Sequence, residues 1–263
     1  MLSLSTDRTP TTTPELIEAL QHGLKAQGIT PKAVEAIGDA FPALSTLRLD
    51  LSDARLTRDC RPVKPQGEKL ATATVERVEI LGQPLYFEGT PLSLHLQAQG
   101  ATAGLYLQNG SGCLVLENAA AGELTLEVPV AALEAALHRL AVEGGAKQGI
   151  EIKQTKVSFT QESAGAVSFR VEVTAKIFVM SATLALTGRL DLDQELNARI
   201  SGLSLDGDAM IQKLAGGFAK PHLDRLEGRT ISLASFTPAG MKVRSVELNA
   251  DPQLKLQAVF GAD

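Results

Sequence analysis

The clearest pattern in the chain is a strict alternation of apolar and polar residues. In "AVSFRVEVTAKIFV", residues 166–179, apolar side chains recur at every second position from Val167 to Val179, with polar ones between them as far as Lys176. The stretch "GRLDLDQELNARISGLSLDG", Gly188–Gly207, continues this step, with a turn at Asp193-Gln194 and a one-residue slip at Gly202. Such alternation is typical of strands with one buried and one wet face. The apolar face covers either the protein's own core or a bound molecule.

The same step of two recurs over most of the chain. It appears in residues 47–56, 74–82, 91–98, 113–118 and 122–130, and again in 230–236, 240–250 and 253–261. Gly, Asn and Pro separate these segments, which indicates about a dozen strands joined by turns. Because the links are short and one face of each strand is polar, we expect mostly antiparallel pairing.

Helical spacing interrupts the strands at a few places. Thr13-Pro14 opens an apolar stripe that ends at Gly28, and Thr30-Pro31 opens a second one over Val34, Ile37 and Phe41. These signals predict a helical pair over residues 14–44, after a disordered tail at 1–13. Further single helices are predicted near 130–143, ending at Gly144-Gly145, and near 208–226. Residues 45–263 then form one α+β domain, in which a highly curved, mostly antiparallel sheet (a half-barrel) wraps around one or two helices.

Composition narrows the classes of partner. Of the 263 residues 44% are hydrophobic but only 4% aromatic, with no Trp, so Leu, Ala and Val supply the interior. The net charge of −5 and the lack of a Lys/Arg-rich run argue against nucleic acid as a partner. The first residues lack a signal peptide pattern, and no apolar stretch approaches the ~20 residues of a spanning helix. As the sequence stands we expect a cytoplasmic protein, and a periplasmic or envelope-associated one if a leader has been removed.

Catalytic and metal-binding motifs are scarce. The four histidines lack metal-ligand spacing, Cys60 and Cys113 are isolated, with a disulfide between them left open, and the glycine-rich segments do not fit a phosphate loop. Asp191 and Asp193 form a D-x-D pair, as do Asp206 and Asp208, but positions in a turn and at a helix cap explain them better than a metal site. We therefore expect no metal, no cofactor and no catalytic residue.

Two stretches carry a resemblance to a known family. "AAAGELTLEVPVAALEAALHRLAVEGG" (119–145) and "LDLDQELNARISGLSLDGDAMIQKLAGGFAKPHLDRLEGRTISL" (190–233) resemble the LmeA-like phospholipid-binding proteins, a branch of the tubular lipid-binding (TULIP-like) superfamily. The resemblance covers most of residues 45–263. It lies in the pattern of strands and helices and not in invariant residues. It implies a long helix in the concave face of a curved antiparallel sheet, with acyl chains held between them and no catalytic residues.

These observations favour a protein that binds a phospholipid or another long-chain apolar ligand without catalysis. Transfer of this ligand between membranes is a further function that the same site could serve. The partners expected are this lipid or fatty-acyl ligand and, transiently, a membrane surface; the oligomeric state is left open. Two alternatives stay open: an interaction module with a filled core and a protein partner, and an enzyme acting on a lipid or glycosylated substrate through an Asp pair. The side chains expected to line the groove are Leu133, Leu137, Val171, Val173, Ile177, Leu184, Leu186, Ile200, Leu214 and Phe218.

Overall fold

The chain divides into two compact units. The computed structural model describes residues 2–4, 9–38, 41–57, 67–108, 111–147, 149–177, 180–207, 223–232, 242–251 and 253–261. The first unit comprises Met1–Glu127, Ala234–Ser245 and Leu256–Asp263, and the second comprises Val128–Leu233 and Val246–Lys255. The single domain expected over 45–263 is therefore distributed over both units.

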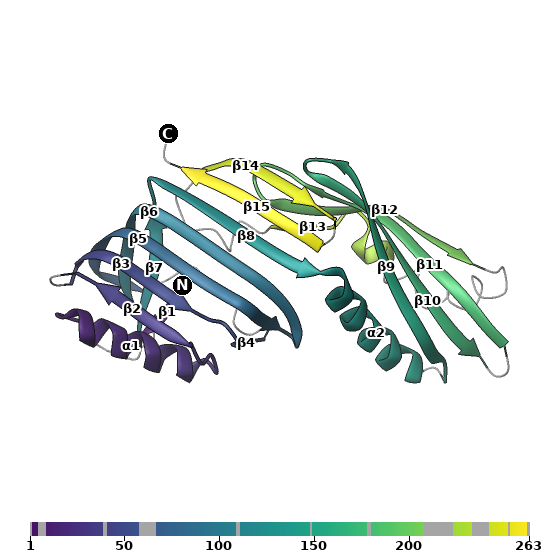
Figure 1. The fold of residues 1–263 in the computed structure, drawn as a ribbon, viewed down its shortest axis with the longest axis horizontal. Helices are drawn as coiled ribbons and strands as arrows, with labels where there is room; N and C mark the ends of the chain where they lie inside the picture. Colours follow the sequence, from purple (N-terminus) through teal and green to yellow (C-terminus); the bar gives the residue numbers. More distant parts are fainter. Residues whose placement is uncertain are drawn as a thin grey trace. The chain divides into compact units, whose positions relative to one another are not determined.

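Strands dominate both units, and the fold class is α+β, as the alternating pattern predicts (Figure 1). One sheet has ten strands, in the order β14-β15-β8-β6-β5-β3-β2, with β7 paired to β6, β1 to β7, and β4 to β5. Its pairs β1–β7, β2–β3, β5–β6, β6–β7 and β6–β8 are antiparallel, whereas β3 and β4 run parallel to β5. The strands are β1 (Leu2–Leu4), β2 (Ala33–Ile37), β3 (Ala43–Asp50), β4 (Arg55–Leu56), β5 (Glu68–Phe87), β6 (Thr90–Gln108), β7 (Ser111–Asn118), β8 (Ala121–Pro129), β14 (Lys242–Asn249) and β15 (Gln253–Gly261).

The closed hydrophobic core lies in the first unit, where helix α1 (Thr13–Ala26) contacts β1 and β2. The hydroxyl of Thr12 caps this helix by accepting a hydrogen bond from the Glu15 backbone N–H at 3.4 Å, and Pro14 stands in its first turn. Leu16 and Leu20 have no exposed surface and pack into one cluster with Leu49 and Leu105 of the sheet. The apolar stripe of α1 thus closes one side of this core.

Two predictions for the N-terminal region are wrong. Residues 2–4, expected in a disordered tail, form β1, which pairs with Gly112–Leu114 of β7. The second helix of the expected pair is absent from the described residues 30–38, where Ala33–Ile37 form β2 instead. The burial of Val34 beside the 58% exposure of Ile37 follows a period of two, because β2 pairs with β3. Pairing with a neighbouring strand has overridden the local helix signals.

The second sheet has five antiparallel strands in the order β13-β12-β11-β10-β9. They are β9 (Glu151–Ser163), β10 (Ala166–Ile177), β11 (Met180–Leu192), β12 (Asn197–Gly207) and β13 (Thr230–Ser232). The predicted turn at 193–194 joins β11 to β12. The predicted slip at Gly202 coincides with a register irregularity opposite Thr187–Arg189, and Gly202 has a φ of +62°, a conformation that favours glycine.

Helix α2 (Val130–Ala146) confirms the helix predicted over 130–143, although it runs through the two glycines expected to end it. It packs against the edge strand β9 (Figure 1). The Glu134 carboxylate accepts a hydrogen bond from the Val157 backbone N–H at 2.8 Å, and His138 Nδ1 lies 3.2 Å from Thr155 Oγ1. Most of the helix predicted over 208–226 lies outside the described residues. Its described part, residues 223–226, is helical.

Candidate functional site

The second sheet gathers five of the expected lining residues on one side, here called the apolar face: Val171, Val173, Leu184, Leu186 and Ile200. Register places Val171 opposite Leu186 and Val173 opposite Leu184, on β10 and β11. Ile200 of β12 pairs with Leu190 of β11 further along. All five side chains are half-buried, unlike the fully buried leucines of the first unit.

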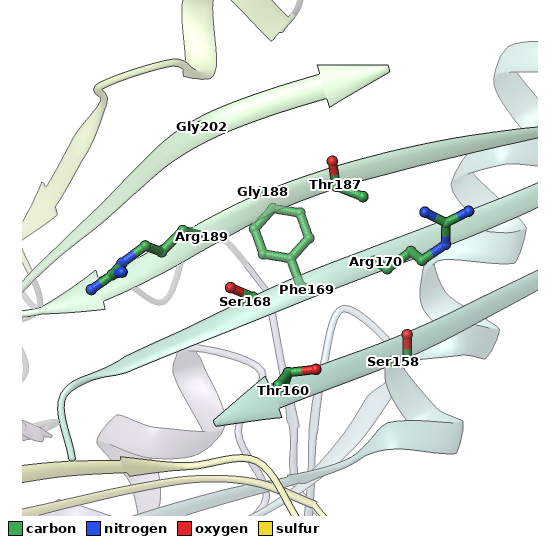
Figure 2. A pocket seen from close by; sticks show the side chains of 9 residues that line it. All are labelled: Ser158, Thr160, Ser168, Phe169, Arg170, Thr187, Gly188, Arg189 and Gly202. Atoms are coloured by element: carbon green, nitrogen blue, oxygen red, sulfur yellow. The ribbon is translucent and has the colours of Figure 1, made fainter. Parts of the chain in front are cut away.

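Phe169 fills the middle of the apolar face. It pairs with Gly188, and a Cβ added at Gly188 would lie 2.5 Å from Phe169 Cζ and 2.8 Å from Leu203 Cδ2. The absent side chain of Gly188 therefore makes room for the aromatic ring, which lies beside this glycine in Figure 2. The ring separates Ile200 from the Val and Leu pairs.

The remaining expected lining residues are less closely grouped. Leu133 and Leu137 lie on α2 and are half-buried, while Leu140, one turn further, is 57% exposed. Ile177 ends β10, where its backbone pairs with Met180. Leu214 and Phe218 lie outside the described residues.

The opposite side of the same sheet carries a hollow of about 400 Å³, which we call the polar dish (Figure 2). Six polar side chains from three neighbouring strands line it: Ser158, Thr160, Ser168, Arg170, Thr187 and Arg189. Register explains the grouping, because Arg170 pairs with Ser158 and Thr187, and Ser168 pairs with Thr160 and Arg189. Phe169, Gly188 and Gly202 complete the lining.

Each arginine of the dish is held by a carboxylate on its own strand. Arg170 Nε lies 2.8 Å from Glu172 Oε1, and Arg189 Nε lies 2.7 Å from Asp191 Oδ1. Because β10 and β11 are antiparallel, these ion pairs draw the two guanidinium groups toward opposite ends of the dish, as Figure 2 shows. Arg170 also borders a second hollow of about 520 Å³, lined by Thr174, Ser181, Ala182, Thr183, Ala185, Asp206 and Gly207.

This dish was missed by sequence reasoning, although the alternation had placed its residues on the wet side of the strands. The available signal was the recurrence of Arg, Ser and Thr at every second position of two adjacent segments. What the sequence lacks is the register that sets Arg170 and Arg189 two residues apart across neighbouring strands.

The aspartates of the D-x-D pairs have structural partners. Asp191 pairs with Arg189, while Asp193 accepts hydrogen bonds from the backbone N–H groups of Glu195 and Asn197 at 2.9 and 2.8 Å. The bond from Asn197 is the main reason why the pKa of Asp193 lies below its usual value. Asp193 therefore stabilises the turn between β11 and β12, as the sequence predicts. Asp206 lines the second hollow, and Asp208 lies outside the described residues.

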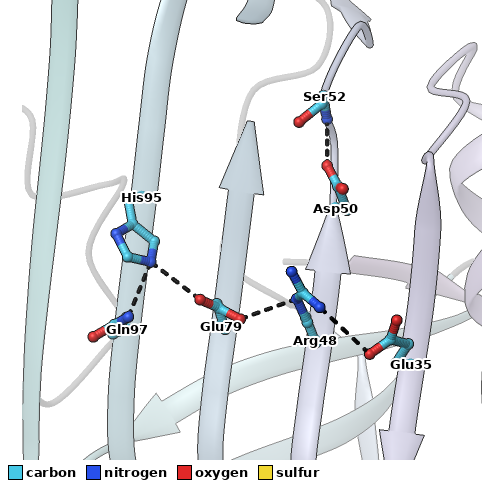
Figure 3. A network of polar contacts seen from close by, with 7 residues as sticks. All are labelled: Glu35, Arg48, Asp50, Ser52, Glu79, His95 and Gln97. Atoms are coloured by element: carbon cyan, nitrogen blue, oxygen red, sulfur yellow. Dashed lines mark hydrogen bonds and ion pairs between the residues drawn. The ribbon is translucent and has the colours of Figure 1, made fainter. Parts of the chain in front are cut away.

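A ladder of polar side chains crosses the outer side of the first sheet (Figure 3). Arg48 of β3 lies between Glu35 of β2 at 3.7 Å and Glu79 of β5 at 3.0 Å, and His95 Nε2 lies 3.2 Å from Glu79 Oε1. The 3.0 Å contact at the buried Nε of Arg48 is an ion pair without the alignment of a hydrogen bond. Beside this ladder, Arg77, Glu79 and Gln97–Gln99 line a hollow of about 250 Å³.

At one end of β3, Ser52 supports the carboxylate of Asp50, whose Oδ1 accepts a hydrogen bond from the Ser52 backbone N–H at 2.9 Å. Burial alone would raise the pKa of Asp50, but the hydrogen bonds from Ser52 outweigh it and the pKa falls. We assign this segment and the ladder to holding neighbouring strands in register.

The described residues contain no group of three or more His, Cys, Asp or Glu side chains placed to hold a metal ion. His22 is exposed on α1, and His222 lies outside the described residues. Cys113 is a free, buried thiol whose pKa is raised by burial, and Cys60 also lies outside the described residues. Within the part of the chain that the structure describes, no helix has both the length and the apolar character needed to cross a membrane.

Comparisons of the chain with family models, with curated proteins and with solved structures gave no match.

Proposed function

We propose that the second unit binds a phospholipid or another long-chain apolar ligand on its apolar face, without catalysing a reaction. The observation that carries the proposal is the half-burial of Val171, Val173, Leu184, Leu186 and Ile200. In this proposal the five-stranded sheet curves around the ligand as a half-barrel, and the leucines of α2 contribute to one side of the groove.

The contrast with the first unit supports this assignment. The core cluster there contains leucines that are almost completely buried, such as Leu49 at 2% exposure, with other aliphatic side chains half-buried against it. On the second sheet Val167 reaches full burial, whereas the five side chains of the apolar face do not. Side chains that line a ligand groove keep part of their surface open until the ligand covers it. The mainly aliphatic character of the face suits a flexible acyl chain, which needs little shape recognition.

The energetics permit exchange with a membrane. Burying one methylene group contributes about 0.8 kcal/mol, so a sixteen-carbon chain gains on the order of 12 kcal/mol on leaving water. Removing the chain from a bilayer costs a similar amount. Moving it from a bilayer to an apolar groove is then close to neutral in free energy, and the transfer needs neither a nucleotide nor a catalytic residue.

The test combines extraction with a binding assay. Native mass spectrometry and organic extraction of freshly purified protein should reveal a bound lipid, and a fluorescent fatty acid should bind to the delipidated protein. Leu184→Gln places a polar group on the apolar face, opposite Val173, and should weaken fatty-acid binding about tenfold or more, because the buried amide lacks a hydrogen-bond partner.

Thr183→Gln is the matched control, since Thr183 is exposed on the opposite side of the same strand and should leave fatty-acid binding unchanged. Both variants should be checked for folding by circular dichroism. A protein that yields no lipid on extraction and binds no fluorescent fatty acid would refute the proposal, as would equal binding by both variants.

A further inference from the structure

We propose that the polar dish is a second binding site, which takes a phosphate group carried either by a small soluble molecule or by a lipid headgroup. The dish lies on the opposite side of the sheet from the apolar face, so this inference does not depend on the proposed function. It rests on the balance of donors and acceptors in the lining, on the positions of the two arginines, and on the open position at Gly202.

The lining is rich in hydrogen-bond donors and contains no carboxylate. Two guanidinium groups and four hydroxyls line the dish, and neither Asp nor Glu is among its nine lining residues. Ser168 donates its hydroxyl hydrogen to Glu162 at 2.7 Å, whereas the hydroxyls of Ser158, Thr160 and Thr187 have no hydrogen-bond partner among the described residues. Such a surface selects a ligand with several acceptor oxygens and negative charge.

The arginines leave their terminal nitrogens for a ligand. The ion-pair contacts of Glu172 and Asp191 are made to the Nε atoms of Arg170 and Arg189, at 2.8 and 2.7 Å. The terminal nitrogens of a guanidinium can bind two oxygens of one phosphate group. Because the two carboxylates also fix the arginine side chains, these nitrogens are positioned before a ligand arrives.

The dish can also admit a bulky group. Gly202 lines the dish without a side chain, and a Cβ added there would meet no atom within 4 Å. Figure 2 shows Arg170 and Arg189 at opposite ends of this space. Since Glu172 and Asp191 neutralise part of the positive charge, we expect a modest affinity, with a Kd on the order of 1 mM.

The experiment uses glycerol 3-phosphate as the soluble probe, and vesicles of phosphatidylcholine with and without phosphatidic acid as the headgroup probe. Binding of the soluble probe is followed by NMR titration of the full chain, and binding to vesicles by co-sedimentation. Arg170→Gln and Arg189→Gln should both weaken binding. The variant that removes the charge-assisted bidentate contact to the phosphate group should weaken it about tenfold, and the variant at the other end of the dish by a smaller factor. Thr187→Val preserves the shape and β-branching of the strand residue and should weaken binding by a smaller factor.

Arg199→Gln is the matched control, because Arg199 is an exposed cation on the neighbouring strand β12, opposite Asp191 in the backbone register, and does not line the dish. Arginine-dependent binding of the soluble probe supports a small-molecule site, and arginine-dependent binding of only the phosphatidic-acid vesicles supports a headgroup as the source. The proposal is overturned if neither probe binds, or if Arg199→Gln weakens binding as much as the two dish variants in folded protein.

Discussion

At the residue scale, Glu117 of β7 is a carboxylate held by side chains of two other strands, β5 and β6. Lys69 Nζ donates to its Oε2 at 2.8 Å, and the Tyr106 hydroxyl donates to its Oε1. Burial tends to raise the pKa of Glu117, but these two hydrogen bonds and the charge of Lys69 outweigh it and lower the pKa. The hydrogen bond to Glu117 is also the main reason why the pKa of Tyr106 is raised.

This arrangement predicts a contribution to stability that acid removes. Because the folded-state pKa of Glu117 is depressed, its contribution is present above the ordinary glutamate pKa and is lost as the pH falls through the folded-state value. Glu117→Gln should therefore lower the free energy of unfolding by about 1 kcal/mol at pH 7, and the difference should shrink as the pH is lowered toward about 3. Urea unfolding of both proteins across this range measures the effect. A difference that persists unchanged at pH 3 would contradict it.

Residue-scale reasoning from the sequence succeeded where local chemistry decides the structure. Asp193 stabilises the predicted turn through bonds to residues only two to four positions away, and Gly202 marks the predicted slip. It failed for Val34 and Ile37, whose spacing fits a helix as well as a strand. Their strand conformation depends on the pairing of β2 with β3, which no local signal encodes.

At the element scale, α2 protects the edge of the second sheet. Val157 lies on the edge strand β9, and its backbone N–H, which points away from β10, is satisfied by the Glu134 carboxylate of α2. A free edge amide of this kind would otherwise offer a pairing site to another strand. The predicted period of α2 was correct, but the choice of β9 as its packing partner required the three-dimensional pairing order.

We expect Glu134→Ala to destabilise the second unit by about 1–3 kcal/mol, because it leaves the buried Val157 N–H without a partner. Glu134→Gln retains an acceptor oxygen and should cost less. Hydrogen exchange at the Val157 amide should accelerate in the alanine variant, while Glu143→Ala, an exposed position on the same helix, should change neither stability nor this exchange rate. Equal effects of the changes at 134 and 143 would show that the edge contact is unimportant.

At the scale of the whole molecule, the two units differ in how they bury apolar side chains. The connected core cluster of buried residues, from Leu16 to Ala119, belongs entirely to the first unit. In the second unit the apolar face stays half-buried. Alternation in the sequence is the same in both cases, so periodicity could predict the strands and their faces but not which face is closed by the protein's own core.

This difference predicts a local response to an apolar ligand. A ligand present at 100 times its Kd stabilises the state that binds it by about 2.7 kcal/mol. Hydrogen exchange of amides in β10 and β11 should then slow by up to about 100-fold when a long-chain fatty acid is added, because openings that expose these amides must first release the ligand. Amides of α1 and β5, which border the closed core, should keep their exchange rates.

Mass-spectrometric hydrogen exchange on the full chain measures both regions in one sample. Leu184→Gln is the control protein, and its exchange rates should not respond to the fatty acid. Uniform slowing across both units, or no slowing in β10 and β11 at saturating fatty acid, would place the ligand elsewhere and leave the apolar face as ordinary packing surface.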